Sequence, residues 1–185
     1  MATTLLRTFV LKINFKFLYS YFCQKAKWNK RKEFDYHIFN YPSKKVEITN
    51  ADVDRIIDSA WSVWSGAKIG LKFTSSNLET ATIKIFFVAG NHSDKWPFDG
   101  EGHVLGHGFY PKDGIIHFDD DEKWGDKKGK GKQLLYVAVH EFGHALGLGH
   151  SNDSSSIMLR SYTGYRANIV LSQDDIDGIK EAFSG

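Results

Sequence analysis

One run of eleven residues constrains this chain more than any other feature: HEFGHALGLGH, which begins at His140. His140 and His144 are four residues apart, so on a helix their imidazoles lie on one face, about a turn apart. Gly147 and Gly149 then interrupt the helical pattern, and a glycine can take a positive φ that turns the chain sharply. Such a turn would return His150 to the other two histidines. The run therefore predicts a helix, a sharp turn and one site shared by three imidazoles.

The residue types in this run are those of a catalytic zinc site. Three neutral imidazoles leave the fourth tetrahedral position of zinc open for water, whose pKa bound zinc lowers to about 7. Glu141 would take a proton as this water attacks a peptide carbonyl and would deliver it to the leaving amine. The alternative is a set of helix histidines satisfied by hydrogen bonds. Three histidines, one glutamate and one glycine at fixed spacing, followed by Met158, favour the metal site.

Hydrophobic periodicity predicts alternating strands and helices after the first 32 residues. The first helix can be capped by Thr49 or Asn50, and Trp61 and Trp64 recur on its apolar face, where we expect them to pack in the core. The last helix begins with a capping box at Ser172. The run GDKKGKGK before the second helix is expected to be a solvated connector. The predicted strands are 33–41, 71–74, 82–89, 104–110 and 115–118, and the predicted helices are 50–65, 133–147 and 172–183.

Charge divides the chain at about residue 32. Residues 1–32 carry eight Lys or Arg and no Asp or Glu, whereas the remainder carries 16 basic and 22 acidic residues. The hydrophobic content of 42% is enough for a packed core, so the acidic part is expected to fold. A nucleic-acid-binding domain needs a basic face. We therefore expect no nucleic-acid partner for the folded part.

The basic leader, residues 1–27, is apolar between Leu5 and Cys23 but is interrupted there by three basic residues. A secretory signal needs an uninterrupted apolar run of about 7–15 residues, and a membrane span needs a longer one. The leader therefore remains open among a poorly formed signal, an anchor and an artefact of the gene start. Cys23 is the only cysteine, which excludes an intramolecular disulfide and suggests an inert thiol.

The run HExxHxxGxxH followed by a methionine resembles the metzincin signature, with Met158 eight residues after His150 at the place of the Met turn. Ser151, directly after the third histidine, resembles the matrixin branch, the matrix metalloproteinases. Further segments match that family in the same order: KW at 27–28, ADVDRIIDSAWSVWS, PFDGEG, HFDDDEKW and LSQDDIDGI. The resemblance covers about residues 28–185. It implies an α+β catalytic domain with a twisted five-stranded, mostly parallel sheet and three helices.

The resemblance also implies two further metal sites. A structural zinc would lie on three histidines and one aspartate, a closed tetrahedral set. A calcium ion would take carboxylates and backbone carbonyls, and would offset repulsion within the acidic run DDDE. The zinc ligands would be His92, Asp94, His107 and His117, and the calcium ligands would be Asp99, Asp119 and Glu122 with the carbonyls of Gly100, Gly102 and Val104. The segment between Phe109 and His117 is shorter than is usual in the family and lacks the Gly-rich run that helps to hold a second calcium, so the resemblance leaves a second calcium site open.

Substrate handling follows from the same resemblance. Matrixins bind an extended peptide against an edge strand, which here would include Gly106. Tyr162 would line the specificity pocket opposite, although Leu159 and Arg160 depart from the Tyr-Pro usual in the family. Tyr136 would form the pocket floor and shorten it. We therefore expect a preference for medium apolar residues such as Leu just after the scissile bond.

Together with the zinc motif, the resemblance implies a secreted, monomeric zinc endopeptidase that acts on extracellular matrix or other extracellular proteins and that protein inhibitors can bind. A second hypothesis is a non-catalytic, metal-dependent binding module that retains the protease fold. A third is a structural zinc protein, which would not need an open coordination site. The presence of Glu141 favours the enzyme. The context of Cys23, YFCQKAK, does not match the pro-segment motif PRCGxPD, so the leader offers no familiar means of latency.

Overall fold

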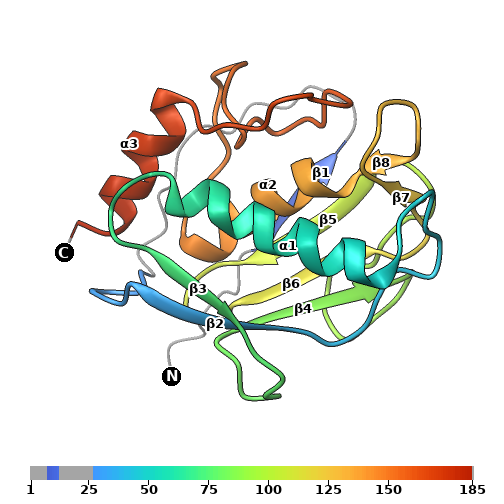
Figure 1. The fold of residues 1–185 in the computed structure, drawn as a ribbon, viewed down its shortest axis with the longest axis horizontal. Coiled ribbons are helices and arrows are strands. Elements are labelled where there is room, and N and C mark those ends of the chain that lie inside the picture. Colours follow the sequence, from blue (N-terminus) through green and yellow to red (C-terminus); the bar gives the residue numbers. More distant parts are fainter. Residues whose placement is uncertain (1–7, 13–26, 185) are drawn as a thin grey trace.

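A computed structural model describes residues 8–12 and 27–184, with side chains for the second range. Most of the predicted leader, including Cys23, lies outside these residues. Three helices and a twisted sheet form the body of the molecule, and helices α1 and α2 run side by side on one face of that sheet (Figure 1). No helix in the described part is both long enough and apolar enough to cross a membrane.

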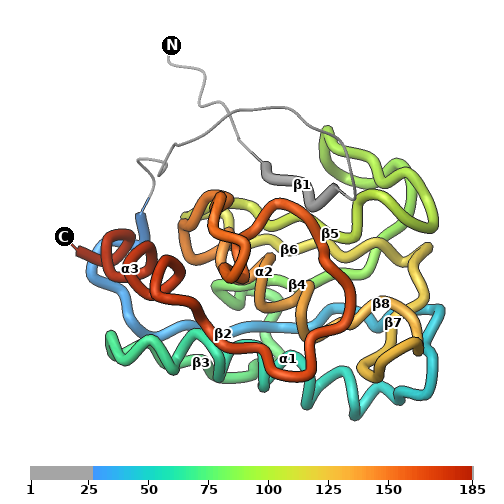
Figure 2. Tube along the Cα trace, turned by 90° about the horizontal axis from the view of Figure 1, so that it is seen from above, coloured from blue at the N-terminus to red at the C-terminus, as the bar shows by residue number. Residues whose placement is uncertain are grey.

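The three predicted helices are confirmed. Thr49 caps the first of them in a capping box with Asp52, and Ser172 caps the last in a capping box with Asp175. The middle helix ends at Gly147, whose φ of 111° is in the left-handed region. The helices are α1 (Asn50–Ser65), α2 (Leu134–Leu146) and α3 (Gln173–Ala182), and α3 lies at one end of the molecule (Figure 2).

The main sheet has the strand order β1-β5-β6-β4-β2-β3. Pairs among β2, β3, β4 and β6 are parallel, whereas β5 is antiparallel to β6. The five strands after residue 27 therefore confirm the predicted five-stranded, mostly parallel sheet. β1, from the leader, was not predicted and adds a sixth strand at the outer edge of β5. The strands are β1 (Thr8–Lys12), β2 (Glu33–Ile38), β3 (Lys72–Ser75), β4 (Ile83–Val88), β5 (Val104–Phe109) and β6 (Ile115–Asp119).

A small two-stranded sheet revises the prediction for the lysine-rich connector. β7 (Trp124–Gly125) pairs with β8 (Lys132–Gln133), so the ends of the segment are ordered against each other. Residues 127–131 between them are exposed, as expected for a solvated run. A Cβ on Gly125 would overlap the carbonyl of Lys130, which explains why glycine is needed there.

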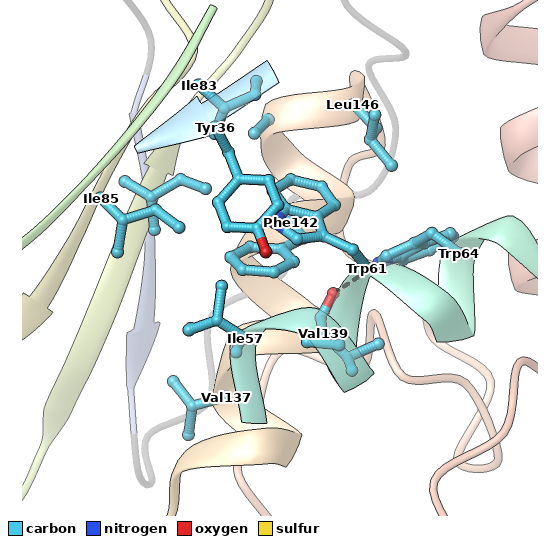
Figure 3. Close-up of a cluster of buried hydrophobic side chains, with 14 of the residues drawn as sticks. Tyr36, Ile57, Trp61, Trp64, Ile83, Ile85, Val137, Val139, Phe142 and Leu146 are labelled. Atoms are coloured by element: carbon cyan, nitrogen blue, oxygen red, sulfur yellow. Dashed lines mark hydrogen bonds between the residues drawn. The ribbon is translucent and has the colours of Figure 1, made fainter. Parts of the chain in front are cut away.

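The core is centred between α1 and α2, and it fixes the helix that carries the histidine run (Figure 3). Trp61 stacks on Phe142 with ring centroids 3.6 Å apart. Trp64 donates a hydrogen bond from Nε1 to the carbonyl of Val139 at 2.8 Å. Both tryptophans are buried, which confirms the core role predicted for them. A Cβ on Gly143 would lie 2.8 Å from Trp64 Cζ2, so only glycine permits this close helix packing.

Candidate metal centre

Helix α2 and the turn after it bring three imidazoles together. His140, His144 and His150 each offer a ring nitrogen, and these nitrogens lie within 4.8 Å of one another. The positive φ of Gly147 reverses the chain, and the Gly147 amide donates to the carbonyl of His144 at 2.9 Å. The return path to His150 that the glycine spacing predicted is therefore present in the fold.

Backbone carbonyls orient two of these rings. His140 Nδ1 lies 2.7 Å from the carbonyl of Ile157, and His144 Nδ1 lies 2.8 Å from the carbonyl of Leu148. Both contacts favour the tautomer in which Nδ1 carries the proton and Nε2 has a free lone pair. His140 Nε2 is buried, with no hydrogen-bond partner among the described residues. A buried acceptor of this kind fits a metal ligand, because a metal would satisfy the lone pair.

The electrostatics of the three rings agree with that function. Burial lowers the pKa of His140 to about 4 and lowers the pKa of His144 well below its usual value. Burial likewise lowers the pKa of His150, and the neighbouring imidazoles lower it further. All three rings are therefore neutral at pH 7, which is the state in which imidazole binds a metal.

Glu141 lies against β5. Its side chain is fully buried, and burial raises its pKa well above the usual value, an effect that the Gly108 amide partly offsets. A Cβ on Gly106 would stand 3.2 Å from Glu141 Cγ, and one on Gly108 would stand 2.6 Å from the Glu141 carbonyl oxygen. The two glycines thus let the edge strand pass directly beside the carboxylate. A buried carboxyl beside three gathered imidazoles is suited to proton transfer.

The Met turn contacts the helix that carries the first two histidines. Met158 is buried, and its sulfur lies so close to Gly143 of α2 that a Cβ there would overlap it. The buried carboxylate of Asp175, at the start of α3, accepts hydrogen bonds from the Ile157 amide at 3.0 Å and the Ser156 hydroxyl at 2.5 Å. The sequence revealed only the capping role of Asp175. Its hold on the turn depends on a contact between residues 17 to 19 positions apart, which no local pattern predicts.

The second cluster gathers His92, Asp94, His107 and His117. Asp94 Oδ2 lies 3.0 Å from His92 Nε2, 2.9 Å from His107 Nε2 and 2.9 Å from His117 Nδ1. His92 Nδ1 in turn lies 2.9 Å from the carbonyl of Gly90, which orients that ring. One carboxylate oxygen and three ring nitrogens thus converge on one small, mostly buried volume, a donor set that fits a four-coordinate metal.

Charge in this second cluster is balanced differently from charge in the triad. Burial lowers the pKa of His107 to about 4 and also lowers that of His117, while Asp94 opposes both shifts. Burial raises the pKa of Asp94, but the Trp96 amide and His107 outweigh it, so the net shift is downward. The aspartate is therefore ionised and two of its partners are neutral at pH 7.

The carboxylates predicted for calcium lie beside the β5–β6 end of the sheet. Asp119 and Glu122 are buried, and one oxygen of each has no hydrogen-bond partner among the described residues. Burial raises the pKa of Asp119 to about 6, and the charges of Glu122 and Asp99 add to the effect. Glu122 accepts a hydrogen bond from the Gly102 amide, and Asp99 accepts one from the Val104 amide at 3.3 Å.

Within the described ranges, three or more acidic, His or Cys ligand atoms come within 4.8 Å of one another only in the two histidine clusters. The three acids predicted for calcium therefore do not close up into a third group of that kind. The loop before β5 contains Gly100 and Gly102 at positive φ. The carbonyls predicted as calcium ligands belong to this loop and to Val104, the first residue of β5. The two buried, unsatisfied oxygens fit a cation that takes most of its ligands from the backbone.

The side chains predicted for the specificity pocket adjoin one another. The rings of Tyr136 and Tyr162 are 5.2 Å apart, and the Tyr162 hydroxyl accepts a hydrogen bond from the Gln133 amide at 3.0 Å. Sequence reasoning missed Arg166, whose guanidinium lies 4.6 Å from the Tyr136 ring centroid. Gln133 binds the backbone of Arg166 through both ends of its side-chain amide. Gln133 and Arg166 thus fix the two tyrosines against each other, at the contact between the start of α2 and the loop after the Met turn.

These features define a class of protein. A helix with two histidines and a glutamate, a glycine turn, a third histidine and a buried methionine turn form the centre of a metzincin-type metallopeptidase domain. The family model described as Matrixin matches residues 27–184. The chain therefore belongs to the matrixin family, and the resemblance noted from its motifs is confirmed.

Individual relatives agree. The chain is 42% identical to matrilysin of Homo sapiens over 169 residues, covering 89% of this chain and 61% of the relative. It is 45% identical to interstitial collagenase of Bos taurus over 151 residues, covering 80% of this chain and 31% of the relative. It is 46% identical to macrophage metalloelastase of Oryctolagus cuniculus over 155 residues, or 81% and 32%. The chain thus spans about three fifths of the human matrilysin and about a third of the other two.

Proposed function

We propose that this chain is a zinc-dependent endopeptidase that hydrolyses peptide bonds of extracellular matrix or other extracellular proteins. The observation that carries the proposal is the triad of neutral, buried imidazoles beside the buried carboxyl of Glu141. Membership of the matrixin family and relatives named as a collagenase and a metalloelastase support it. The extracellular location rests on the same relationship.

His140, His144 and His150 would hold the catalytic zinc. When bound, zinc supplies a Lewis acid that polarises a carbonyl and acidifies water. Glu141 would act as general base: as a carboxylate beside the three imidazoles it would accept a proton from the attacking water, and burial, which raises its pKa, favours its holding that proton until it is released to the departing amine. The carbonyls of Ile157 and Leu148 keep two of the rings in the orientation needed for this.

We propose a structural zinc on His92, Asp94, His107 and His117, and a calcium ion at Asp99, Asp119 and Glu122 with the carbonyls of Gly100, Gly102 and Val104. The closed donor set supports the first, and the two buried oxygens without partners support the second. The catalytic domain is residues 28–185, preceded by a leader of residues 1–27. The domain acts as a monomer that protein inhibitors can bind.

An extended polypeptide substrate would lie along β5 near Gly106, with its next side chain toward Tyr136 and Tyr162. The tyrosine pair, held by Gln133, supports a shallow pocket. Medium apolar residues such as Leu are therefore expected just after the scissile bond. Profiling with a peptide library checks this, and a strong preference for large aromatic groups would contradict it.

The test of the activity compares the full chain with Glu141→Gln in the presence of zinc and calcium. Metal content is measured by mass spectrometry, and cleavage is measured on a quenched Pro-Leu-Gly-Leu peptide. We expect kcat/KM to fall by about 10²–10⁴ while the zinc content stays the same, because only the proton-transfer group is lost. Equal rates in both proteins would overturn the mechanism. Absence of turnover in the wild type, with metals bound, would favour the non-catalytic binding module.

A further inference from the structure

The leader strand lies on the edge of the sheet nearest to the triad. β1 pairs antiparallel with β5, with Thr8 opposite Phe109, Phe9 opposite Gly108 and Val10 opposite His107. Since β6 takes the other side of β5, β1 lies at the one side of β5 that the rest of the sheet leaves open. The ribbon in Figure 1 shows β1 beyond β5, away from β6. The leader thus contributes a backbone ladder to the edge beside which an extended peptide would have to bind.

This edge is adjacent to the catalytic helix. The paired stretch of β5 includes Gly108, which approaches the Glu141 carbonyl, and His107, which belongs to the second histidine cluster. A strand on the outer side of β5 forms main-chain hydrogen bonds with any sequence that can extend, which is the way β-augmentation binds peptides. One strand edge can pair with only one segment at a time.

We propose that residues 8–12 are an internal competitor for the strand-binding edge of β5 and so restrain the activity of the chain on extended polypeptides. This inference rests on the proposed function, and it supplies a restraint that does not need a cysteine on the metal. The segment acts by main-chain pairing, so it excludes substrate without having to ligate any ion.

The pairing of β1 with β5 is limited to a few residues and is interrupted between Val10 and Lys12, so the isolated segment would bind weakly. Two properties of the chain strengthen the contact. The segment is tethered to the domain, and a short tether gives an effective concentration in the millimolar range. The first 32 residues are also basic, with eight Lys or Arg and no Asp or Glu, whereas the rest of the chain carries six more acidic than basic residues, so long-range attraction favours the contact at low salt.

The experiment uses the full chain and two adjacent substitutions, Phe9→Pro and Val10→Pro. Successive amides of a strand point to opposite sides, so only one of these two residues can donate toward β5. Proline removes that donor, and the variant that removes the bonded amide should break the ladder. The other variant serves as a matched partner with a smaller effect, and Leu18→Pro is a control elsewhere in the leader.

Hydrogen exchange tests the contact without relying on turnover. In a Glu141→Gln background, which prevents self-cleavage, the amides of β5 should exchange faster in the more disruptive proline variant than in the wild-type leader or in Leu18→Pro. Unchanged exchange across β5 in both proline variants would overturn the proposal. A complete lack of turnover in every chain with Glu141 present would instead contradict the proposed function, while the exchange data would still decide whether the strand contact exists.

Steady-state kinetics tests the competition. With Glu141 present, the ladder-breaking variant should show a KM for the quenched peptide that is about threefold to tenfold lower, with kcat unchanged. A synthetic peptide of residues 6–14, added to that variant, should raise KM again in a competitive manner. An equal KM in the ladder-breaking variant and the wild type, together with faster exchange in β5, would overturn the claim that the segment restrains activity.

Discussion

The two histidine clusters differ in how they complete their donor sets. In the second cluster, one oxygen of Asp94 stands about 3 Å from all three imidazoles, so protein atoms supply four converging donors. The triad gathers three ring nitrogens, and Glu141, which follows His140 on the same helix, is not among the gathered donors. Both clusters keep imidazoles neutral by burial, yet only one is closed by a carboxylate.

The comparison teaches that ring burial alone does not distinguish the proposed structural metal site from the proposed catalytic one. Burial lowers the pKa of His107 and that of His140 to about 4 in both cases. What differs is the position of the acid. An ionised aspartate inside the donor set closes a site, whereas a glutamate with a raised pKa next to an open set is available for proton transfer.

The sharpest way to break the comparison is to remove one triad ligand with His144→Ala. We expect kcat/KM to fall by at least about a hundredfold, because the chain loses a preorganised group at the proposed reactive centre. The second cluster should keep its metal, so total zinc should fall by one equivalent and not by two. Activity assays and metal analysis check both statements, and loss of both metals would show that the clusters are not independent.

Asp94→Asn removes the acid from the closed set and should act on stability more than on chemistry. Breaking a buried charged group away from its partners costs about 3–5 kcal/mol, and we expect a loss of that size in the free energy of unfolding. Urea denaturation with metals present measures it. The turnover per folded, zinc-loaded molecule should remain within about tenfold of the wild type. A larger loss of turnover than of stability would contradict the division of roles.

Gly143→Ala tests how far the triad depends on the packing beneath it. The added methyl group would overlap Met158 and press on Trp64, and overpacking of this kind costs about 1–3 kcal/mol. The matched control is Gly178→Ala in α3, where a Cβ would lie 3.4 Å from Leu148 Cδ2. That substitution should be neutral or stabilising, because alanine favours a helix. Thermal unfolding compares the two, and equal effects would contradict the packing argument.

Acidification should affect the metal-free chain through both clusters. A histidine whose folded pKa lies below its unfolded value of about 6.5 takes up its proton in the unfolded chain first. Stability is therefore lost as pH falls from about 6.5 toward about 4, the folded value of both His107 and His140, by about 1.4 kcal/mol per pH unit for each extra proton bound. Urea titrations in EDTA at pH 7 and pH 5 measure the slope. Burial of Asp119 acts in the opposite sense, so Asp119→Asn should steepen the slope below pH 6.

The features of this molecule that could be predicted from the sequence are those that depend on the spacing of residues within one segment. The four-residue step from His140 to His144 and the glycines after it determine where the imidazoles point, and the capping box at Ser172 determines where α3 begins. The second cluster came from a family resemblance, since positions 92 to 117 follow no regular period. Without that resemblance, its four donors would have remained scattered polar residues.

What escaped prediction depends on contacts between segments far apart in the chain. The pairing of β1 with β5 joins residues about 100 positions apart, and nothing in the leader's composition identifies its partner. The contact of Arg166 with Tyr136 is equally non-local. Propensity and periodicity describe a segment and its own neighbours, so they cannot identify such partners.

The position of Asp175 near the end of the chain means that the histidine site can be completed only late in synthesis. The turn whose carbonyl orients His140 is fastened by a side chain near the end of the domain. During translation, the histidine run is synthesised about thirty residues before Asp175. A nascent chain, or a product of premature termination before α3, would therefore contain the histidine run without the Asp175 hydrogen bonds to the turn that orients the His140 ring. Hydrolytic competence would then be acquired only in the last stretch of translation.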